Sequence, residues 1–354
     1  LYALEGTVVL RFGWWDHFEQ QRGIPLAQQY DERLDLLRVA DAHGLYGYHV
    51  AEHHFTPLDM APSPLVFLAA AARETSAIRL GALVLVLPLY NPARLVQELY
   101  LVDHLSHGRL MPGVGCGVRD VEHEWFGHQQ EEARARFAET LTIVRHALAE
   151  DRLDFSGRYY AFDDVPTRFT THQKPIRFWY AGNIKSALDG AMNVIGIGKR
   201  EDYDAYAQTW TERRAAGDPA YQGEEPIAGS TRRIIIAETD AQARAIAERA
   251  WPAYQANFHA TSLRIDGRPG PVSRADPEED PLAAAERGGV VFGSPARARD
   301  ILLNYIDRLG PNHTYFAPAF QWGDITHTEA RLSMDLFCSE VMPALRALRA
   351  EVPA

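Results

Sequence analysis

The stretch GYHVAEHHFTP, residues 47–57, decides the fold of this chain. Its first four residues fit a short strand, and a helical pattern begins near Ser63. Between them stand Glu52, His53 and His54. In a parallel β/α protein, polar side chains that follow a strand meet at the carboxyl edge of the sheet, where chemistry takes place. We therefore expect a βα unit here, with a catalytic residue at its turn.

Strand-like and helical segments alternate along the rest of the chain, which is typical of a parallel sheet. Strands are expected at 7–12, 47–50, 78–88, 109–115, 176–182, 194–197, 232–239, 290–293 and 313–319. Helices are expected between them, among others at about 26–43, 63–74, 201–216 and 240–257. No Gly-x-Gly-x-x-Gly motif follows the first strand, so an open doubly wound sheet is disfavoured. The sequence predicts one α/β domain over 1–354, a (β/α)8 TIM barrel with insertions.

Two insertions interrupt the alternation. Residues 155–175 resemble a surface hairpin followed by an irregular run. Residues 259–289 are rich in Pro, Gly and charged residues, and they precede the strand at 290–293. A loop of this length in a compact domain is either disordered or a lid over a site. We expect a lid over the carboxyl end of the barrel.

Composition restricts the classes of partner. The net charge of −11 argues against nucleic acid and anionic membranes, because both attract basic surfaces. The two cysteines provide no disulfide framework, and no apolar run is long enough to span a membrane. The first residues show no export pattern. These features predict a cytoplasmic protein.

Several segments together resemble the bacterial luciferase-like flavin-dependent monooxygenases. They occur in the family's order: AEHHF (51–55), SPLVFLAAAARETSAIRLG (63–81), VLPLYNPARLVQELYLVDHLSHGRL (86–110), GVGCG (113–117), WYAGNIKSALDGA (179–191) and VFGSPARARDILLNYIDRLG (291–310). The resemblance implies a barrel that binds reduced FMN, which a separate flavin reductase supplies. It further implies that O2 forms a flavin peroxide, from which one oxygen atom enters a small organic substrate. A homodimer is also a family expectation.

The resemblance makes His53 the acid/base group beside the flavin. Imidazole suits this task because its ordinary pKa lies near the working pH. Glu52 either orients a histidine or is a solvated loop acid. Consecutive residues of an extended chain point to opposite sides, so we expect His54 to face away from His53. Adjacent histidines with no third ligand nearby do not indicate a metal site, and none is predicted.

The resemblance also assigns residues to the flavin ring. It implies a non-prolyl cis peptide between Leu83 and Val84 beneath the ring, and it has Gly115 face the ring. Cys116 stands near the flavin edge, where many members carry an arginine that reaches the phosphate. Cysteine has no positive charge, so one anchor is missing. Arg119 either replaces it or is a surface residue.

A phosphate site is expected where the strand at 176–182 meets the next helix, because free amides at a helix N-terminus bind anions. The resemblance assigns Gly182, Asn183 and Ser186 to this site. Asn and Ser are also ordinary N-cap residues, and the two roles are compatible.

Two other functions stay open. A deazaflavin-dependent oxidoreductase of the same barrel family would transfer hydride without oxygen, and the departure at Cys116 keeps this alternative open. A non-catalytic flavin-binding subunit is the second, although retention of His53 argues against it. Near the end of the first strand, some of Phe12, Trp14, Trp15 and His17 are expected to wall the substrate pocket, and packing in the core explains them equally well.

Overall fold

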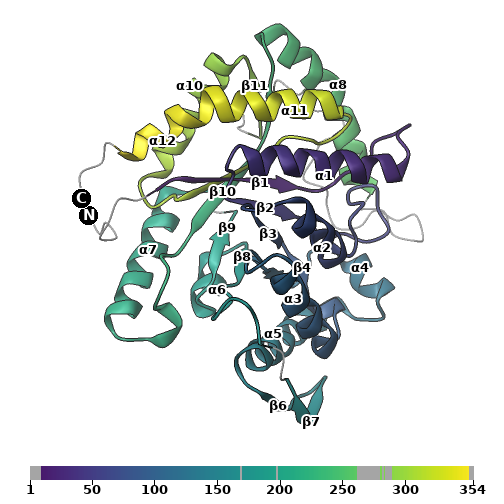
Figure 1. Cartoon of the computed structure of the whole chain (residues 1–354), viewed down its shortest axis with the longest axis vertical. Coiled ribbons are helices and arrows are strands. Elements are labelled where there is room, and N and C mark those ends of the chain that lie inside the picture. Colours follow the sequence, from purple (N-terminus) through teal and green to yellow (C-terminus); the bar gives the residue numbers. More distant parts are fainter. Residues whose placement is uncertain are drawn as a thin grey trace.

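The computed structural model describes residues 9–167, 170–196, 198–260 and 289–350, together with residues 280 and 283. A closed parallel sheet forms its centre, and helices surround the sheet (Figure 1). The strands of this sheet are β1 (Arg11–Asp16), β2 (Gly47–Val50), β3 (Arg79–Ala82), β4 (Leu85–Val86), β5 (Gly113–Gly115), β8 (Trp179–Ala181), β9 (Asn193–Ile195), β10 (Ala228–Ile236), β11 (Val290–Gly293) and β12 (Tyr315–Ala319).

The sheet closes because one run of chain contributes to both of its ends. The strand order is β3-β2-β1-β12-β10-β9-β8-β5-β4, with β11 paired to β10 outside this path. Since β3 and β4 both belong to the run 79–86, the nine strands of the path occupy eight positions around a barrel. Every pair in it is parallel. The predicted (β/α)8 barrel is confirmed.

Helices follow the strands and pack against the outside of the barrel. They are α1 (Leu26–Ala42), α2 (Pro64–Glu74), α3 (Pro92–Leu105), α4 (Asp120–Trp125), α5 (Ala133–Ala149), α6 (Ile184–Asp189), α7 (Arg200–Ala215), α8 (Asp240–Ala260), α10 (Pro295–Leu309), α11 (His327–Leu336) and α12 (Met342–Ala350). Side chains fix several helix starts by accepting orphan amide hydrogens. Asn91 caps α3, Ser294 caps α10, and Thr326 forms a capping box with Glu329 at α11.

Aromatic side chains fill the inside of the barrel. The ring of Trp179 lies 4.9 Å from that of His49 and 5.2 Å from that of Tyr315, measured between centroids. The Tyr315 hydroxyl and His49 Nε2 are 2.9 Å apart, and both residues are fully buried. The lower interior is therefore packed, and any site must lie at an end of the barrel.

Several strands have other bounds than the sequence predicts, and β1 and β10 show one physical reason. β1 continues through Gly13 to Asp16 rather than ending at residue 12, and β10 starts at Ala228 rather than at 232. Each strand contains a glycine that resembles a strand breaker. A Cβ at Gly13 would lie 1.8 Å from the Tyr315 hydroxyl oxygen, and one at Gly229 would lie 2.6 Å from the Tyr315 carbonyl oxygen. Glycine is needed there because Tyr315 occupies the space.

The insertions differ in how far they are described. The predicted hairpin is present, but it begins earlier, with β6 (Arg152–Ser156) pairing antiparallel with β7 (Ala161–Pro166). It projects beyond the ring of helices (Figure 1). The predicted lid, 259–289, lies almost entirely outside the described residues. The strand at 290–293 is present as β11, although it pairs with β10 alone.

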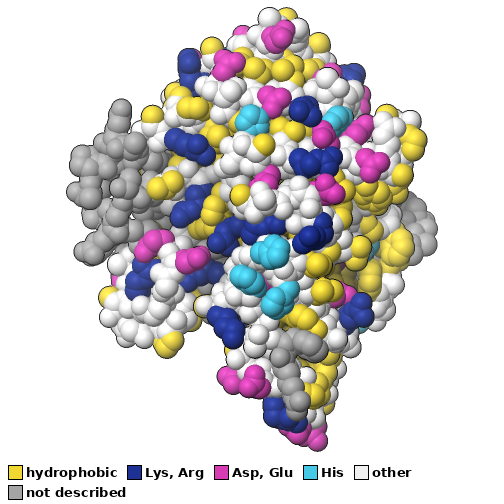
Figure 2. Space-filling view, in the orientation of Figure 1, with side chains coloured by type: hydrophobic (Ala, Val, Ile, Leu, Met, Phe, Trp, Pro, Cys, Tyr) yellow, Lys and Arg dark blue, Asp and Glu magenta, His cyan; other side chains and the backbone are white. Residues whose placement is uncertain are grey.

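The surface charge is unevenly distributed. Figure 2 shows histidine, lysine and arginine side chains gathered near the middle of one face, although the whole chain carries a net charge of −11. Within the described ranges, no helix is long and apolar enough to cross a membrane.

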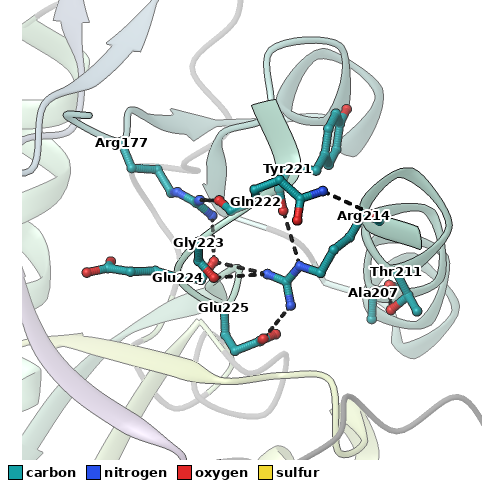
Figure 3. A network of polar contacts seen from close by, with 9 residues as sticks. All are labelled: Arg177, Ala207, Thr211, Arg214, Tyr221, Gln222, Gly223, Glu224 and Glu225. Carbon is teal, nitrogen blue, oxygen red and sulfur yellow. Dashed lines mark hydrogen bonds and ion pairs between the residues drawn. The ribbon is translucent and has the colours of Figure 1, made fainter. Parts of the chain in front are cut away.

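Two arginines fix the loop that leads into β10 (Figure 3). Arg214, at the end of α7, donates to the carbonyl oxygens of Tyr221 at 3.2 Å and Glu224 at 3.2 Å, and it pairs with the Glu225 carboxylate. Arg177 donates to the carbonyl oxygen of Glu224 at 3.0 Å. These charged donors satisfy backbone groups that have no strand partner.

We predict that Arg214→Met lowers the free energy of unfolding by about 1–3 kcal/mol, because the carbonyl groups of this loop lose their donors. Urea unfolding followed by circular dichroism measures the change. Arg213→Met is the matched control, since the Arg213 side chain is 61% exposed and lies 3.9 Å from its Asp218 partner. Equal stability of the Arg214 variant and the wild type would show that the loop needs no such anchor.

Candidate active site

A cavity of about 730 Å³ opens at the carboxyl ends of the strands. Its size is within the range of small-molecule sites. Eight of the nine site residues predicted from the sequence line it, and only Gly182, between two lining residues, is not among them. The lining residues from that set are Glu52, His53, Leu83, Val84, Gly115, Cys116, Asn183 and Ser186. Segments that are far apart in the sequence therefore meet at one end of the barrel.

His53 is held by two carboxylates. Its Nδ1 lies 3.1 Å from Oε1 of Glu122, a residue of α4, and its backbone amide donates to Asp59 Oδ2 at 3.1 Å. Burial alone would raise the pKa of the Glu122 carboxyl, but the hydrogen bond and charge of His53 and the amide of His54 lower it. Glu122 is therefore ionised and can only accept. Consequently Nδ1 of His53 carries a proton, and its Nε2 is the basic nitrogen in the neutral ring.

His54 has a different carboxylate partner. Its Nε2 lies 2.9 Å from Glu52 Oε1, and its ring packs 4.6 Å from the Phe126 ring, between centroids. Glu52 is buried and also accepts from the Val86 amide at 3.1 Å and the Tyr90 hydroxyl at 2.8 Å. Glu52 thus orients His54 rather than His53, and it is no solvated loop acid. His54 does not line the cavity, whereas His53 does.

The end of β1 contributes two aromatic side chains to the wall of the cavity. Trp15 and His17 both line it, and their ring centroids are 4.4 Å apart. The His17 ring lies 5.7 Å from the His53 ring. Burial lowers the pKa of His17 well below its ordinary value, and the charges of His53 and Arg233 lower it further. His17 is therefore neutral at physiological pH, which makes it a hydrogen-bonding group rather than a cation.

The floor of the cavity is formed where β3 ends and β4 begins. The Leu83–Val84 peptide bond is cis, as the resemblance implies, and its contact with a flavin stays a prediction. A Cβ at Gly115 would lie 2.5 Å from Cγ2 of Val84. The glycine therefore allows β5 to approach this segment closely, in addition to any space that it leaves for a ligand.

The far end of the cavity is polar. Asn183 caps α6 by accepting the Ser186 amide hydrogen at 2.9 Å, and both side chains line the cavity. Gly182 has a φ of +135°, a conformation that favours glycine. Lys185 pairs with Asp189 on the exposed face of α6. Asn183 and Ser186 are thus available to an anion in this end of the cavity, whereas Lys185 is engaged elsewhere.

A different arginine from the expected one lies near Cys116. Burial raises the pKa of the Cys116 thiol, and the charge of Arg134 opposes this shift. Arg134 is an exposed residue in the first turn of α5, and it lines the cavity. Arg119 instead lies over the Phe258 ring, with its guanidinium carbon 4.9 Å from the ring centroid. Arg134 is thus a cation whose charge acts on Cys116, and a contact of Arg119 with a phosphate stays a prediction.

Sequence reasoning missed Glu122, Asp59 and Arg134. Glu122 is 69 positions from His53, and no local pattern connects them. Burial raises the pKa of Asp59 well above its ordinary value, and hydrogen bonds from the Ala61 and His53 amides oppose this shift. The only signal in the sequence was the position of Glu122 and Arg134 along the chain. Both lie in the helical region that follows the strand ending at Gly115. Among the described residues, no group of three or more His, Cys, Asp or Glu is arranged to hold a metal ion.

A closed parallel barrel whose carboxyl end holds a cavity with an oriented histidine has the design of a barrel enzyme. Comparison with known families makes the class specific. The family described as luciferase-like monooxygenase matches residues 10–312. The chain therefore belongs to the luciferase-like monooxygenase family.

Three relatives show the range of this family. The chain is 32% identical to the uncharacterized protein y4wF of Sinorhizobium fredii, covering 89% of this chain and 92% of that protein. It is 25% identical to limonene 1,2-monooxygenase of Rhodococcus erythropolis, and the match covers 88% of this chain and 80% of that protein. It is 28% identical to the F420-dependent glucose-6-phosphate dehydrogenase of Nocardia farcinica, and the match covers 91% of this chain and 96% of that protein. Monooxygenases and a deazaflavin enzyme are thus both relatives.

Two solved structures share the fold. Monooxygenase RslO1 from Streptomyces bottropensis superimposes with a TM-score of 0.78 at 24% identity, covering 94% of this chain and 99% of that one. The oxygenating constituent of 3,6-diketocamphane monooxygenase from Pseudomonas putida, in complex with FMN, gives a TM-score of 0.70 at 17% identity, with coverage of 95% and 98%.

We predict that Glu122→Gln lowers the free energy of unfolding at neutral pH by about 1–3 kcal/mol, because a buried carboxylate and its charged hydrogen bond are lost. The native pKa of Glu122 is below the ordinary value of 4.5. Its stabilisation is therefore present above about pH 4.5 and is lost as the pH falls through the native pKa.

The gap in stability between wild type and variant should consequently narrow between about pH 6 and about pH 3.5. Urea unfolding at both pH values measures the gap. Glu131→Gln changes an exposed carboxylate of the same cavity and is the control. A gap that is constant with pH would contradict the ionised state assigned to Glu122.

Proposed function

We propose that the chain is the oxygenase component of a two-component system that uses reduced FMN to insert one oxygen atom of O2 into a small organic substrate. One observation carries the proposal: in a member of this family, the oriented His53, the Leu83–Val84 segment and the polar residues at Asn183 line a single cavity. A separate flavin reductase would supply the reduced FMN. A homodimer in the cytoplasm is part of the same proposal.

The residues present fit FMN at both of its ends. The floor formed by Leu83, Val84 and Gly115 is apolar and suits a planar ring system. The opposite end offers Asn183, Ser186 and the positive charge of Arg134, which suits a phosphate. The camphane enzyme, which has the same fold, is a complex with FMN, and this supports FMN as the cofactor.

When bound, reduced FMN supplies the electrons and the position at which O2 is activated. The chain's own groups supply orientation and proton transfer. Glu122 accepts a hydrogen bond from Nδ1–H of His53, so that Nε2 of His53 can take up or return a proton in the cavity. Trp15 and Leu83 help to exclude water, which protects reactive species from side reactions.

Hydride transfer with a deazaflavin is the second candidate function. The F420-dependent relative, 28% identical over 91% of the chain, favours it specifically. Both functions use the same barrel, so the cofactor and the fate of O2 distinguish them.

The experiment that tests the proposal is an anaerobic titration of the protein with reduced FMN and, separately, with reduced deazaflavin. Each complex is then mixed with oxygenated buffer, and flavin absorbance and oxygen consumption are followed. Tight FMN binding with protein-dependent oxygen consumption is the expected result. Deazaflavin-stimulated turnover without oxygen consumption would replace the proposal with the second function. Flavin binding without turnover of either kind would indicate a non-catalytic subunit.

We predict that His53→Ala leaves FMN affinity and thermal stability nearly intact but reduces oxygenation at least about 100-fold, the usual scale for a positioned acid/base. Product formation with isotopically labelled O2 measures the loss. Wild-type rates in this variant would remove His53 from the chemistry.

We predict that Arg134→Met weakens FMN binding about tenfold and leaves riboflavin binding unchanged, because only FMN carries the phosphate. Flavin fluorescence titrations measure both affinities. Arg136→Met is the matched control, since Arg136 lies on the same helix but pairs with Glu132 and packs on the Tyr159 ring. An equal loss for both flavins would place the phosphate away from Arg134.

A further inference from the structure

One arginine at the carboxyl end of the barrel has no role in the proposed chemistry. Arg233 lies on β10, four residues after Gly229, which faces Tyr315 in the barrel interior. Residues an even number apart share a face of a strand, so Arg233 also points inward. Its guanidinium carbon lies 3.9 Å from the ring centroid of Tyr254 and 5.6 Å from that of Trp15. Arg233 therefore reaches a wall of the candidate active site.

A continuous series of rings leads from this arginine to the acid/base group. The Trp15 and His17 ring centroids are 4.4 Å apart, and those of His17 and His53 are 5.7 Å apart. All three of these rings line the cavity. A molecule of modest size that touched Arg233 would therefore present its remaining atoms close to His53.

The charge of Arg233 is incompletely compensated. The carboxyl group that acts on it, Glu19, is 2% exposed, and its Oε2 accepts from Asn257 Nδ2 at 3.1 Å and from the Gly323 amide at 3.0 Å. Its Oε1 is buried and accepts no hydrogen bond in the described part of the chain. Burial raises the pKa of Glu19 to about 7, so this group is only partly ionised at neutral pH. Over the described ranges, Arg233 forms no ion pair within 4.0 Å of a carboxylate.

A second arginine adds to the positive potential. Arg119 lies over the ring of Phe258, one turn along α8 from Tyr254, which packs on Arg233. The His17 ring feels both guanidinium charges, because each of them contributes to lowering the pKa of His17, after burial and His53. Arg119 and Arg233 are both partly buried, and a cation that is partly withdrawn from water is stabilised by an anion or by several acceptors.

We propose that Arg233 and its surroundings form the subsite for an anionic group of the substrate, and that this substrate is a small organic acid, a carboxylate or a sulfonate. This inference rests on the proposed function, because it assigns a substrate class to the same cavity. The planar guanidinium fork matches the paired oxygens of a carboxylate or sulfonate. Trp15 and Tyr254 provide apolar surface for the adjoining carbon atoms, and the far end of the molecule would be oxygenated near His53.

The test compares acids with their neutral isosteres on the full chain, with and without saturating FMN. The probes are phenylacetate with phenylacetamide, octanoate with octanamide, and octane-1-sulfonate, and calorimetry measures their dissociation constants. We expect at least one acid to bind about tenfold more tightly than its amide, the scale of one charge-assisted contact. Comparing octane-1-sulfonate with octanoate shows whether the subsite prefers a sulfonate or a carboxylate.

Two variants localise the effect. Arg233→Met should remove most of this tenfold preference and leave the affinity for the amide within about twofold. Arg233→Lys should retain part of the preference, because it keeps the charge but loses the fork. Arg232→Met is the matched control: Arg232 is the preceding residue on β10 and lies over the Tyr305 ring at 4.2 Å, so the preference should persist.

Equal affinity of the wild type for acids and amides would overturn the inference, and so would a preference that survives in a folded Arg233→Met protein. If that variant does not fold, the wild-type pairs and Arg233→Lys decide the matter. A preference for acids in a protein that binds no flavin would contradict the proposed function and support the anionic subsite. Flavin-dependent oxygen consumption without any preference for acids would overturn the subsite alone.

Discussion

Tyr315 is the side chain on which the rest of this barrel depends. It fills the lumen, bonds to His49, and packs on Trp179, so the lower interior is closed. Strands β1 and β10 approach it only because Gly13 and Gly229 have no side chain. This packing leaves space for a ligand only above it, at the carboxyl ends of the strands. The position of the cavity is therefore a consequence of how the core is filled.

Above this core, two adjacent histidines serve different purposes because different carboxylates hold them. Glu52 fixes His54 inside the structure and also binds the segment that forms the cavity floor. Glu122 fixes His53 and determines which of its ring nitrogens is basic. The Val86 amide, which donates to Glu52, attaches the 51–55 turn to β4, and the contacts of Glu122 with His53 and His54 attach it to α4. One turn can thus be both a structural anchor and the source of a reactive group, which is consistent with the oxygenase function proposed for this family member.

Several features of the fold and the site could be read from periodicity and resemblance. β2 and β11 occupy the predicted residues, and α1 and α2 differ from prediction by one residue at an end. The cis bond at Leu83–Val84 and the convergence of the predicted site residues were also foreseen. The predicted end of β1 and the predicted start of β10 were wrong, because a glycine in isolation resembles a breaker. The reason for each glycine, which is close packing against Tyr315, appears only in the folded structure.

The barrel and the residues at its strand ends could be predicted before folding was considered, because the alternation of strand and helix patterns is local and the family motifs are contiguous. The partners of those residues could be identified only in the folded chain. Glu122 and Arg134 follow β5 and Arg233 lies on β10, and no spacing rule links any of them to His53. Their effects on charge and proton position depend on distance through the protein interior. Such distances exist only after the chain has closed into a barrel.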